Sequence, residues 1–188
     1  LRKLGYPEGL YRVGPLARLN ATKITTPKAG AYLGKFAKKF GNPAHHPLAY
    51  NIARAIELVQ AVELVQKMLR DERITGDDIR IEVKPKLGEG VGVVEAPRGT
   101  LIHHYATSGD GLIRTANLIV ATGQNVPTIE TGVRDFSKRM LPDILKEKDE
   151  VAWKIETLIR AYDPCISCAT HIVEIQVDDH GQGRRTVR

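Results

Sequence analysis

Residues 47–71 place apolar side chains along one broad side of a predicted helix, and this pattern limits the possible folds of the chain more than any other feature. Five of these side chains recur at alternating spacings of three and four residues, the repeat of an α-helix. They are Ala55, Leu58, Val62, Val65 and Leu69. Ile52, Ile56 and Val59 widen the apolar stripe. Such a helix would be about 37 Å long, and we expect its apolar face to need partner helices that this chain barely supplies.

The remaining segments predict a fold that is mainly α with a small antiparallel β region. Residues 1–44 are expected to be mostly loop, with a short helix at 31–40 and Gly/Pro-rich turns elsewhere. The predicted strands are residues 79–83, 92–95, 100–106, 112–117 and 172–177. A hairpin turn is predicted at 108–111, a further turn at 88–92 and a loop at 121–133, which contains Pro127. One helical turn is predicted at 136–140, a helix at 144–161 and a mobile polar tail at 178–188.

Composition excludes several classes of protein. The chain has 188 residues, of which 42% are apolar and 27% charged, as in a folded globular protein. It contains no apolar run of the roughly 20 residues that a membrane span requires, and residues 1–5 lack the apolar region of a signal peptide. The net charge is +6, but the basic residues are dispersed, so nucleic-acid binding is not expected. Two cysteines are too few for a disulfide scaffold and favour a reducing compartment.

Both cysteines lie in residues 163–171, Asp-Pro-Cys-Ile-Ser-Cys-Ala-Thr-His. Thiolates and imidazole are ligands for soft and borderline metals. A structural zinc site would use Cys165, Cys168 and His171, with His103, His104 or His180 as a fourth ligand. A thioredoxin-like pair fits poorly because a helix precedes it, and haem attachment would need His directly after the second Cys. Two buried thiols without a ligand are the remaining alternative.

The context of these cysteines resembles the C-terminal signature of nickel–iron hydrogenase large subunits. Two further stretches resemble motifs of the same family, in the same order. They are residues 95–103, Glu-Ala-Pro-Arg-Gly-Thr-Leu-Ile-His, and residues 11–20, Tyr-Arg-Val-Gly-Pro-Leu-Ala-Arg-Leu-Asn. The family's N-terminal Arg-x-Cys-Gly-x-Cys motif is absent. The resemblance therefore implies the C-terminal portion of the hydrogenase large-subunit fold, inactive alone, over residues 1–171.

The resemblance implies roles for individual residues. Cys165 would be a terminal nickel ligand and the first proton acceptor, and Cys168 would bridge nickel to an iron that carries CN and CO. Arg98, after Pro97, would overhang the open metal position, with Asp163 beside it. Thr122 would offer its hydroxyl to a cyanide ligand. From pattern alone, these last three would be ordinary turn and strand-end residues. His171 would bind a separate Mg or Fe ion.

The same resemblance implies partners and processing. An iron–sulfur small subunit, electron-acceptor subunits, the missing N-terminal half and nickel chaperones are expected, and a maturation endopeptidase would remove residues 172–188. The motifs are most similar to the cytoplasmic groups linked to F420, NAD(P) or heterodisulfide reductase. Residues 88–92 fail the dinucleotide fingerprint because they precede a strand. Two alternatives stay open: a metal-free large-subunit-like protein of a respiratory complex, and a small zinc-binding module.

Overall fold

The computed structural model describes residues 2–144, 148–165, 167, 173–177 and 183–187. The helices are α1 (Pro15–Ala21), α2 (Pro27–Phe40), α3 (Ala49–Met68), α4 (Ala121–Ile144) and α5 (Lys148–Ala161), with short 3-10 helices at Arg2–Leu4 and Glu72–Thr75. The strands are β1 (Gly88–Ala96), β2 (Gly99–Thr107), β3 (Ile113–Ile119), β4 (Val173–Val177) and β5 (Gly183–Val187). The predicted class, mainly α with a small antiparallel β region, is confirmed.

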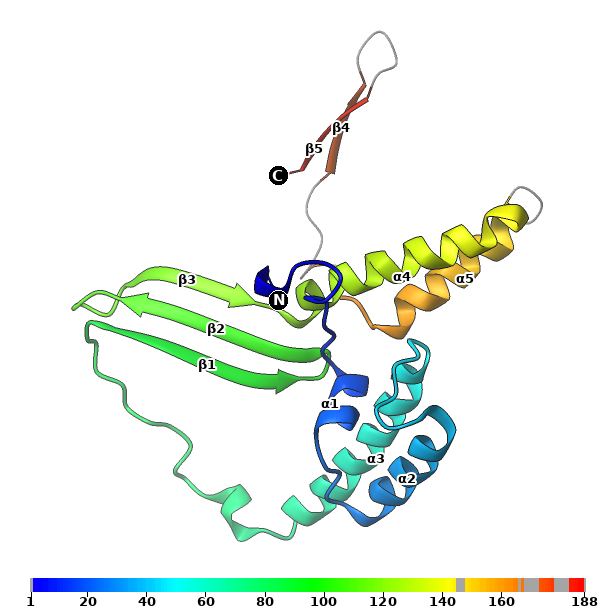
Figure 1. The fold of residues 1–188 in the computed structure, drawn as a ribbon. Coiled ribbons are helices and arrows are strands. Elements are labelled where there is room, and N and C mark those ends of the chain that lie inside the picture. The colour runs from blue at the N-terminus through cyan, green and yellow to red at the C-terminus, as the bar shows by residue number, and fades with distance from the viewer. Residues whose placement is uncertain (1, 145–147, 166, 168–172, 178–182, 188) are drawn as a thin grey trace.

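Three parts of the fold meet near the start of α1. Figure 1 shows the helices α1, α2 and α3 gathered on one side, the β1–β2–β3 sheet extending in a second direction, and the long α4–α5 pair extending in a third. The chain enters α1 at the same place where the β1–β2 turn lies and where α4 begins (Figure 1). Residues that are far apart in the sequence are therefore brought together at this junction.

The core lies between α1, α2, α3 and the end of α5. Its buried members are Leu16, Leu19, Ala29, Phe36, Ala44, Ala49, Tyr50, Ala53, Ile56, Ala161 and Tyr162. Tyr50 is the largest fully buried side chain, and its ring stacks at 4.9 Å on that of Tyr162. Burial raises the pKa of Tyr50 to about 12. The hydroxyl therefore keeps its proton at neutral pH and donates it to the Val13 carbonyl at 3.1 Å.

The helix predicted at residues 47–71 is confirmed as α3, but of the predicted stripe only Ile56 is buried and Val59 packs against the core. The buried residues are Ala49, Tyr50, Ala53 and Ile56. The predicted stripe, Ala55, Leu58, Val62, Val65 and Leu69, is exposed, with Leu58 at 65% and Leu69 at 70%. The helix is apolar on two sides, and α1, α2 and α5 pack against only one of them. The predicted stripe is thus the face that the helices of this chain leave uncovered, as expected of a face that needs further partners.

The sheet consists of two antiparallel hairpins that share β2. Ala96 pairs with Gly99, so Pro97 and Arg98 form a two-residue turn between β1 and β2. The predicted turn at 108–111 is confirmed between β2 and β3, where the Gly111 amide donates to the Ser108 carbonyl at 2.9 Å. The predicted turn at 88–92 is wrong, because these residues belong to β1. The strand predicted at 79–83 is also wrong: no described strand pairs with it, and Ile79 is 89% exposed.

The N-terminal region holds more helix than predicted. Helix α1 was not expected, and α2 begins four residues before its predicted start. Both helices begin with a proline, Pro15 and Pro27. Proline suits the first helical position because its fixed φ matches the helix and its missing N–H would have no helical partner there. Prolines read as loop punctuation were in fact helix starts.

The loop predicted at 121–133 is also wrong, because it forms the first half of α4. Pro127 removes one backbone donor from the helix, yet α4 continues through it and packs along α5. Contacts with other segments hold its first turns: Gln124 Nε2 donates to the Thr100 carbonyl at 2.6 Å. The helical turn predicted at 136–140 is part of α4, and Ile144 ends this helix instead of beginning the next.

The C-terminal described residues form a separate hairpin of β4 and β5. Figure 1 shows this hairpin apart from the helices and the larger sheet. The predicted strand at 172–177 corresponds to β4, while β5 lies within the segment that was predicted to be a mobile tail. Among the helices described here, none is long and apolar enough to cross a membrane.

Candidate metal centre

Four stretches of the chain meet at the junction of the three parts. They are residues 11–14 before α1, 95–100 at the β1–β2 turn, 121–125 at the start of α4, and 161–165 after α5. Each of the three motifs found in the sequence contributes one stretch, and α4 contributes the fourth. The junction therefore brings together described residues of all three motifs.

Arg98 and Asp163 form an ion pair at this junction. Arg98 Nε lies 3.3 Å from Asp163 Oδ2 and donates to the Asp163 carbonyl oxygen at 3.1 Å. Asp163 has φ +52°, a left-handed conformation that is uncommon for residues other than glycine. The side chains are 46% and 44% exposed, so the pair faces open space within this chain. The structure thus brings together two residues that lie 65 positions apart.

Thr122 and Cys165 form the second pair. The Cys165 amide donates to Thr122 Oγ1 at 3.1 Å, and Thr122 is 5% exposed in the first turn of α4. A hydroxyl that accepts one hydrogen bond can still donate its own proton. The Cys165 sulfur lies 3.4 Å from Ser167 Oγ, and metal binding would require its thiolate form.

Two glycines allow the β1–β2 turn to lie directly against the residues before α1. Gly99 has φ +138°, and a Cβ there would lie 2.6 Å from Val13 Cγ2. Gly14 has φ +105°, and a Cβ there would lie 2.8 Å from the Arg98 carbonyl oxygen. Only glycine fits at such contacts. The backbone of Arg98 is therefore held against the Val13–Gly14 peptide.

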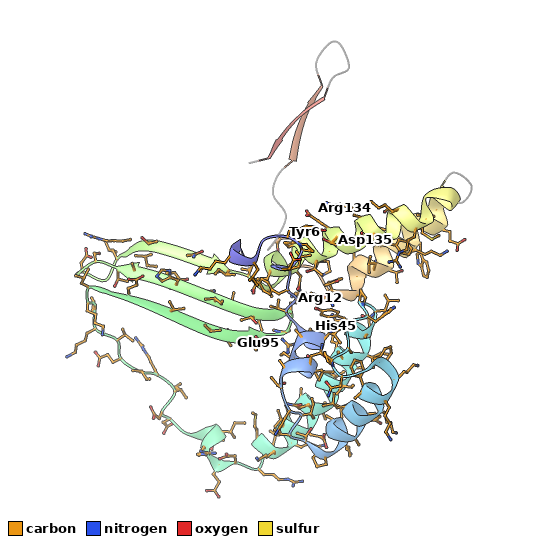
Figure 2. All side chains as sticks on the ribbon, in the orientation of Figure 1. Tyr6, Arg12, His45, Glu95, Arg134 and Asp135 are labelled. Carbon is orange, nitrogen blue, oxygen red and sulfur yellow. The ribbon has the colours of Figure 1, made fainter. Side chains whose placement is uncertain are left out.

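Asn125, which the sequence patterns did not indicate, holds this peptide from the other side. It is 1% exposed. Its Oδ1 accepts a hydrogen bond from the Val13 amide at 2.9 Å, and its Nδ2 donates to the Val13 carbonyl at 3.2 Å. Nearby, Arg12 Nη1 donates to the His45 carbonyl at 2.8 Å, and Figure 2 shows these two residues side by side.

Replacement of Asn125 with alanine is expected to lower the free energy of unfolding by about 2–3 kcal/mol, because the buried Val13 amide would lose its partner. Asn117→Ala, on exposed β3, is the matched control, with an expected change below about 0.5 kcal/mol. Chemical denaturation of both variants checks the difference. Equal effects would show that the Asn125 bridge contributes nothing specific.

Of the remaining predicted ligands, the structure describes only His103 and His104. Cys168, His171 and His180 lie outside the described residues. His103 Nδ1 lies 3.2 Å from the Tyr105 hydroxyl, and His104 Nε2 lies 2.6 Å from Glu89 Oε1. Within the described part of the chain, no group of three or more His, Cys, Asp or Glu could hold a metal.

Comparison with known proteins identifies the family of this chain. Residues 5–171 match the family described as nickel-dependent hydrogenase. The chain belongs to this family. A solved structure titled as an NAD+-reducing NiFe-hydrogenase in the H2-reduced state superposes with a TM-score of 0.82 at 41% identity, over 91% of this chain and 38% of that one. The fold is the C-terminal region of the hydrogenase large subunit.

Individual relatives give the same assignment. The matching polypeptide of the F420-non-reducing hydrogenase vhc of Methanococcus voltae is 47% identical over 92% of this chain and 37% of its own length. The beta subunit of the NAD-reducing hydrogenase HoxS of Cupriavidus necator is 45% identical over 91% of this chain and 36% of its own. The chain thus spans somewhat more than a third of the relatives it matches.

Proposed function

We propose that this chain is the C-terminal part of the catalytic subunit of a nickel–iron hydrogenase, which converts H2 reversibly to protons and electrons. The observation that carries this proposal is the convergence of the Arg98–Asp163 pair and the Thr122–Cys165 pair at one junction. Arg98 comes from the second motif, Asp163 and Cys165 come from the C-terminal motif, and Thr122 comes from the first turn of α4. A family member that had lost its chemistry would have no need to retain these residues together.

Cys165 and Cys168 would supply two thiolates to the metals, with Cys165 as a terminal nickel ligand and Cys168 as a bridge to iron carrying CN and CO. Thiolates donate strongly to nickel. The further thiolates would come from the part of the relatives' length that this chain does not span. When bound, the nickel–iron group would supply heterolytic splitting of H2. His171 is proposed to hold a separate Mg or Fe ion.

The chain's own residues would then orient and move a proton. The Thr122 hydroxyl accepts a hydrogen bond from the Cys165 amide, which would hold the backbone of Cys165, and the proton of this hydroxyl would be available for a cyanide ligand of the bound group. The Cys165 sulfur is the proposed first proton acceptor. Arg98 presents a planar cation with several fixed donors, and Asp163 fixes the direction of that cation. Pro97 completes the two-residue turn that carries Arg98.

The proposal includes partners in the cytoplasm. Electrons leaving the metals would pass first to a small iron–sulfur subunit, then to electron-acceptor subunits. Nickel chaperones and a maturation endopeptidase would act on the chain before assembly. The exposed apolar side of α3, with Leu58 65% exposed, suits burial against the part of the large subunit that this chain does not span.

Elemental analysis tests the proposal. We expect nickel and iron at about one each when the chain is produced together with a complementary N-terminal portion and the maturation proteins, and neither metal when it is produced alone, because the described residues offer no complete donor set. Cys165→Ser should abolish nickel loading, whereas Ser167→Ala, which alters the neighbouring hydroxyl, should preserve it. Stoichiometric zinc in the isolated chain would support the zinc module instead, and absence of metal in both samples would support a metal-free relative.

We also propose that residues 172–188 are removed on maturation. The described part of this segment, β4 and β5, pairs only within itself as a hairpin, so its removal would break no strand pairing to the β1–β3 sheet. Intact-mass measurement of nickel-loaded protein is expected to show a chain that ends at His171. Active protein that retains Ile172 and the following residues would contradict this prediction.

A further inference from the structure

Arg18 on α1 makes contacts with two parts of the junction at once. Its Nε and Nη2 donate to the two carboxylate oxygens of Glu57 at 2.7 and 2.8 Å, a paired geometry that fixes the plane of the guanidinium. The side chain is 19% exposed. The hydrogen bond to Glu57 raises the pKa of Arg18 above its usual value. Burial lowers this pKa in part, and the hydrogen bond to Glu95 raises it further. Arg18 is thus a permanently charged group locked to α3.

The other donors of Arg18 all bind the end of β1. Nη1 donates to Glu95 Oε2 and to the Ala96 carbonyl, both at 2.9 Å, and Nη2 donates to the Pro97 carbonyl at 3.0 Å. Figure 2 places Glu95 at the end of β1 that faces α1. Three consecutive residues are held by one side chain, and the next residue in the chain is Arg98.

The other half of the Arg98–Asp163 pair is held by the same helix. Arg54, three residues before Glu57 on α3, donates from Nη2 to the Ala161 carbonyl at 3.2 Å. Ala161 ends α5 two residues before Asp163. Positions three apart lie on the same side of a helix. Helix α3 is therefore the common support of both partners of the ion pair, through Glu57 and Arg18 on one side and Arg54 on the other.

Apart from the contacts of Gly99 and Thr100 at the start of β2, the sheet has little to fix the end of β1. The seven residues between the ends of β1 are all exposed, and so are all seven residues of β3. The β1–β2–β3 sheet extends away from the helices (Figure 1). An extended sheet anchored at one end can tilt about that end, and a small tilt would displace the two-residue turn that carries Arg98.

We propose that Arg18 is the positioning residue for Arg98: clamped by Glu57, it holds residues 95–97 so that the Arg98 guanidinium meets Asp163. That Arg18 holds residues 95–97 follows from contacts within this chain. The expected effect on hydrogen turnover rests on the proposed function. Among the described residues, the side-chain hydrogen bonds of Arg18 go to Glu57 and to residues 95–97 and not to Cys165, so its proposed action is through the turn.

Comparison of Arg18→Gln, Arg18→Lys and Arg73→Gln in the complete, assembled enzyme tests the proposal. Arg73 is the matched control, because it also binds a carboxylate, that of Asp71, but is 90% exposed and lies outside the junction. Amide hydrogen exchange in residues 95–100 should become at least about tenfold faster in Arg18→Gln and remain unchanged in Arg73→Gln. Lysine should restore only part of the protection, since one ammonium cannot span the carboxylate and the two carbonyls.

Turnover supplies a readout that a merely structural role would not give. Arg18→Gln should lower kcat by about 10²-fold, as displacement of a reacting group by about 1 Å does, with KM for H2 and nickel content unchanged. In an Arg98→Lys background, the same substitution should cause less than about a twofold further loss, because the group it positions is already changed. If the kcat losses of the two substitutions multiplied in the double variant, the proposal would be overturned. It would also be overturned if amide hydrogen exchange in residues 95–100 stayed unchanged in Arg18→Gln. An assembled wild type without nickel or turnover would contradict the proposed function, and hydrogen exchange would still decide whether Arg18 positions the turn.

Discussion

Replacement of Arg98 with lysine is expected to lower H2 turnover by about 10²–10³-fold in the complete enzyme while nickel content stays the same. The guanidinium is rigid and planar and binds both the carboxylate and the backbone carbonyl of Asp163. A lysine ammonium is a compact, strongly hydrated charge on a flexible stem, so it would not occupy the position that the guanidinium holds beside Asp163. The loss should appear in kcat, because the substitution changes donor geometry and retains the charge.

Arg114→Lys is the matched control for this prediction. Arg114 lies on β3, where every residue is exposed, and the same change of donor geometry there should leave turnover within about twofold of the wild type. Hydrogen-uptake assays with an artificial acceptor and nickel analysis on the same samples make the comparison. If Arg98→Lys retained full turnover, Arg98 would be only a turn residue and its assigned role would be wrong.

Replacement of Gly99 with alanine is expected to lower the free energy of unfolding by about 3–5 kcal/mol, combining backbone strain with overpacking. The residue has φ +138°, which side chains rarely tolerate, and the new Cβ would lie 2.6 Å from Val13 Cγ2 and 2.8 Å from the Gly14 nitrogen. Backbone atoms cannot yield as a flexible side chain can, so either the turn or the stretch before α1 must move. Turnover should fall with stability, because Arg98 precedes this residue.

Gly34→Ala is the matched control for Gly99→Ala. Gly34 lies on α2 with nothing within 4 Å of a new Cβ, so alanine should raise stability by about 0.5–1 kcal/mol through its higher helix propensity. Thermal unfolding of the two variants side by side should give midpoints displaced in opposite directions. A Gly99→Ala variant as stable as the wild type would mean that the turn is not held against Val13.

The motifs that carry the chemistry could be recognised in the sequence because each is a short, contiguous stretch. The pairs between them could not. Arg98 meets Asp163 across 65 positions, and Cys165 meets Thr122 across 43. The sequence placed Thr122 in a loop, whereas it lies in the first turn of α4. Pro127 favoured the prediction of a loop at this place. The contacts that stabilise α4, with α5, Thr100 and Val13, come from segments that are distant in the sequence, so no local pattern indicated the helix.

Arg18 shows the same limit for a single side chain. It stands within a recognised motif, yet nothing in its neighbours indicates that it would bind Glu57, 39 positions away, together with Glu95 and the Pro97 carbonyl. Such a role arises only when α1, α3 and β1 are brought to one point. A charge in a motif is visible in the sequence, but its partners are not.

By itself, the sequence determined the properties that depend on neighbouring residues: the existence of α3, the 108–111 turn, the mainly α class, and the family to which the three motifs point. Periodicity and turn chemistry act over a few residues, so they can be read directly. Only the tertiary structure decided which side of α3 is buried. This helix has apolar residues on two sides, so the positions of the neighbouring helices decide which of the two sides is covered. The tertiary structure also decided the pairing of Arg98 with Asp163 and of Thr122 with Cys165, because hydrogen bonds between distant residues depend on the path of the whole chain.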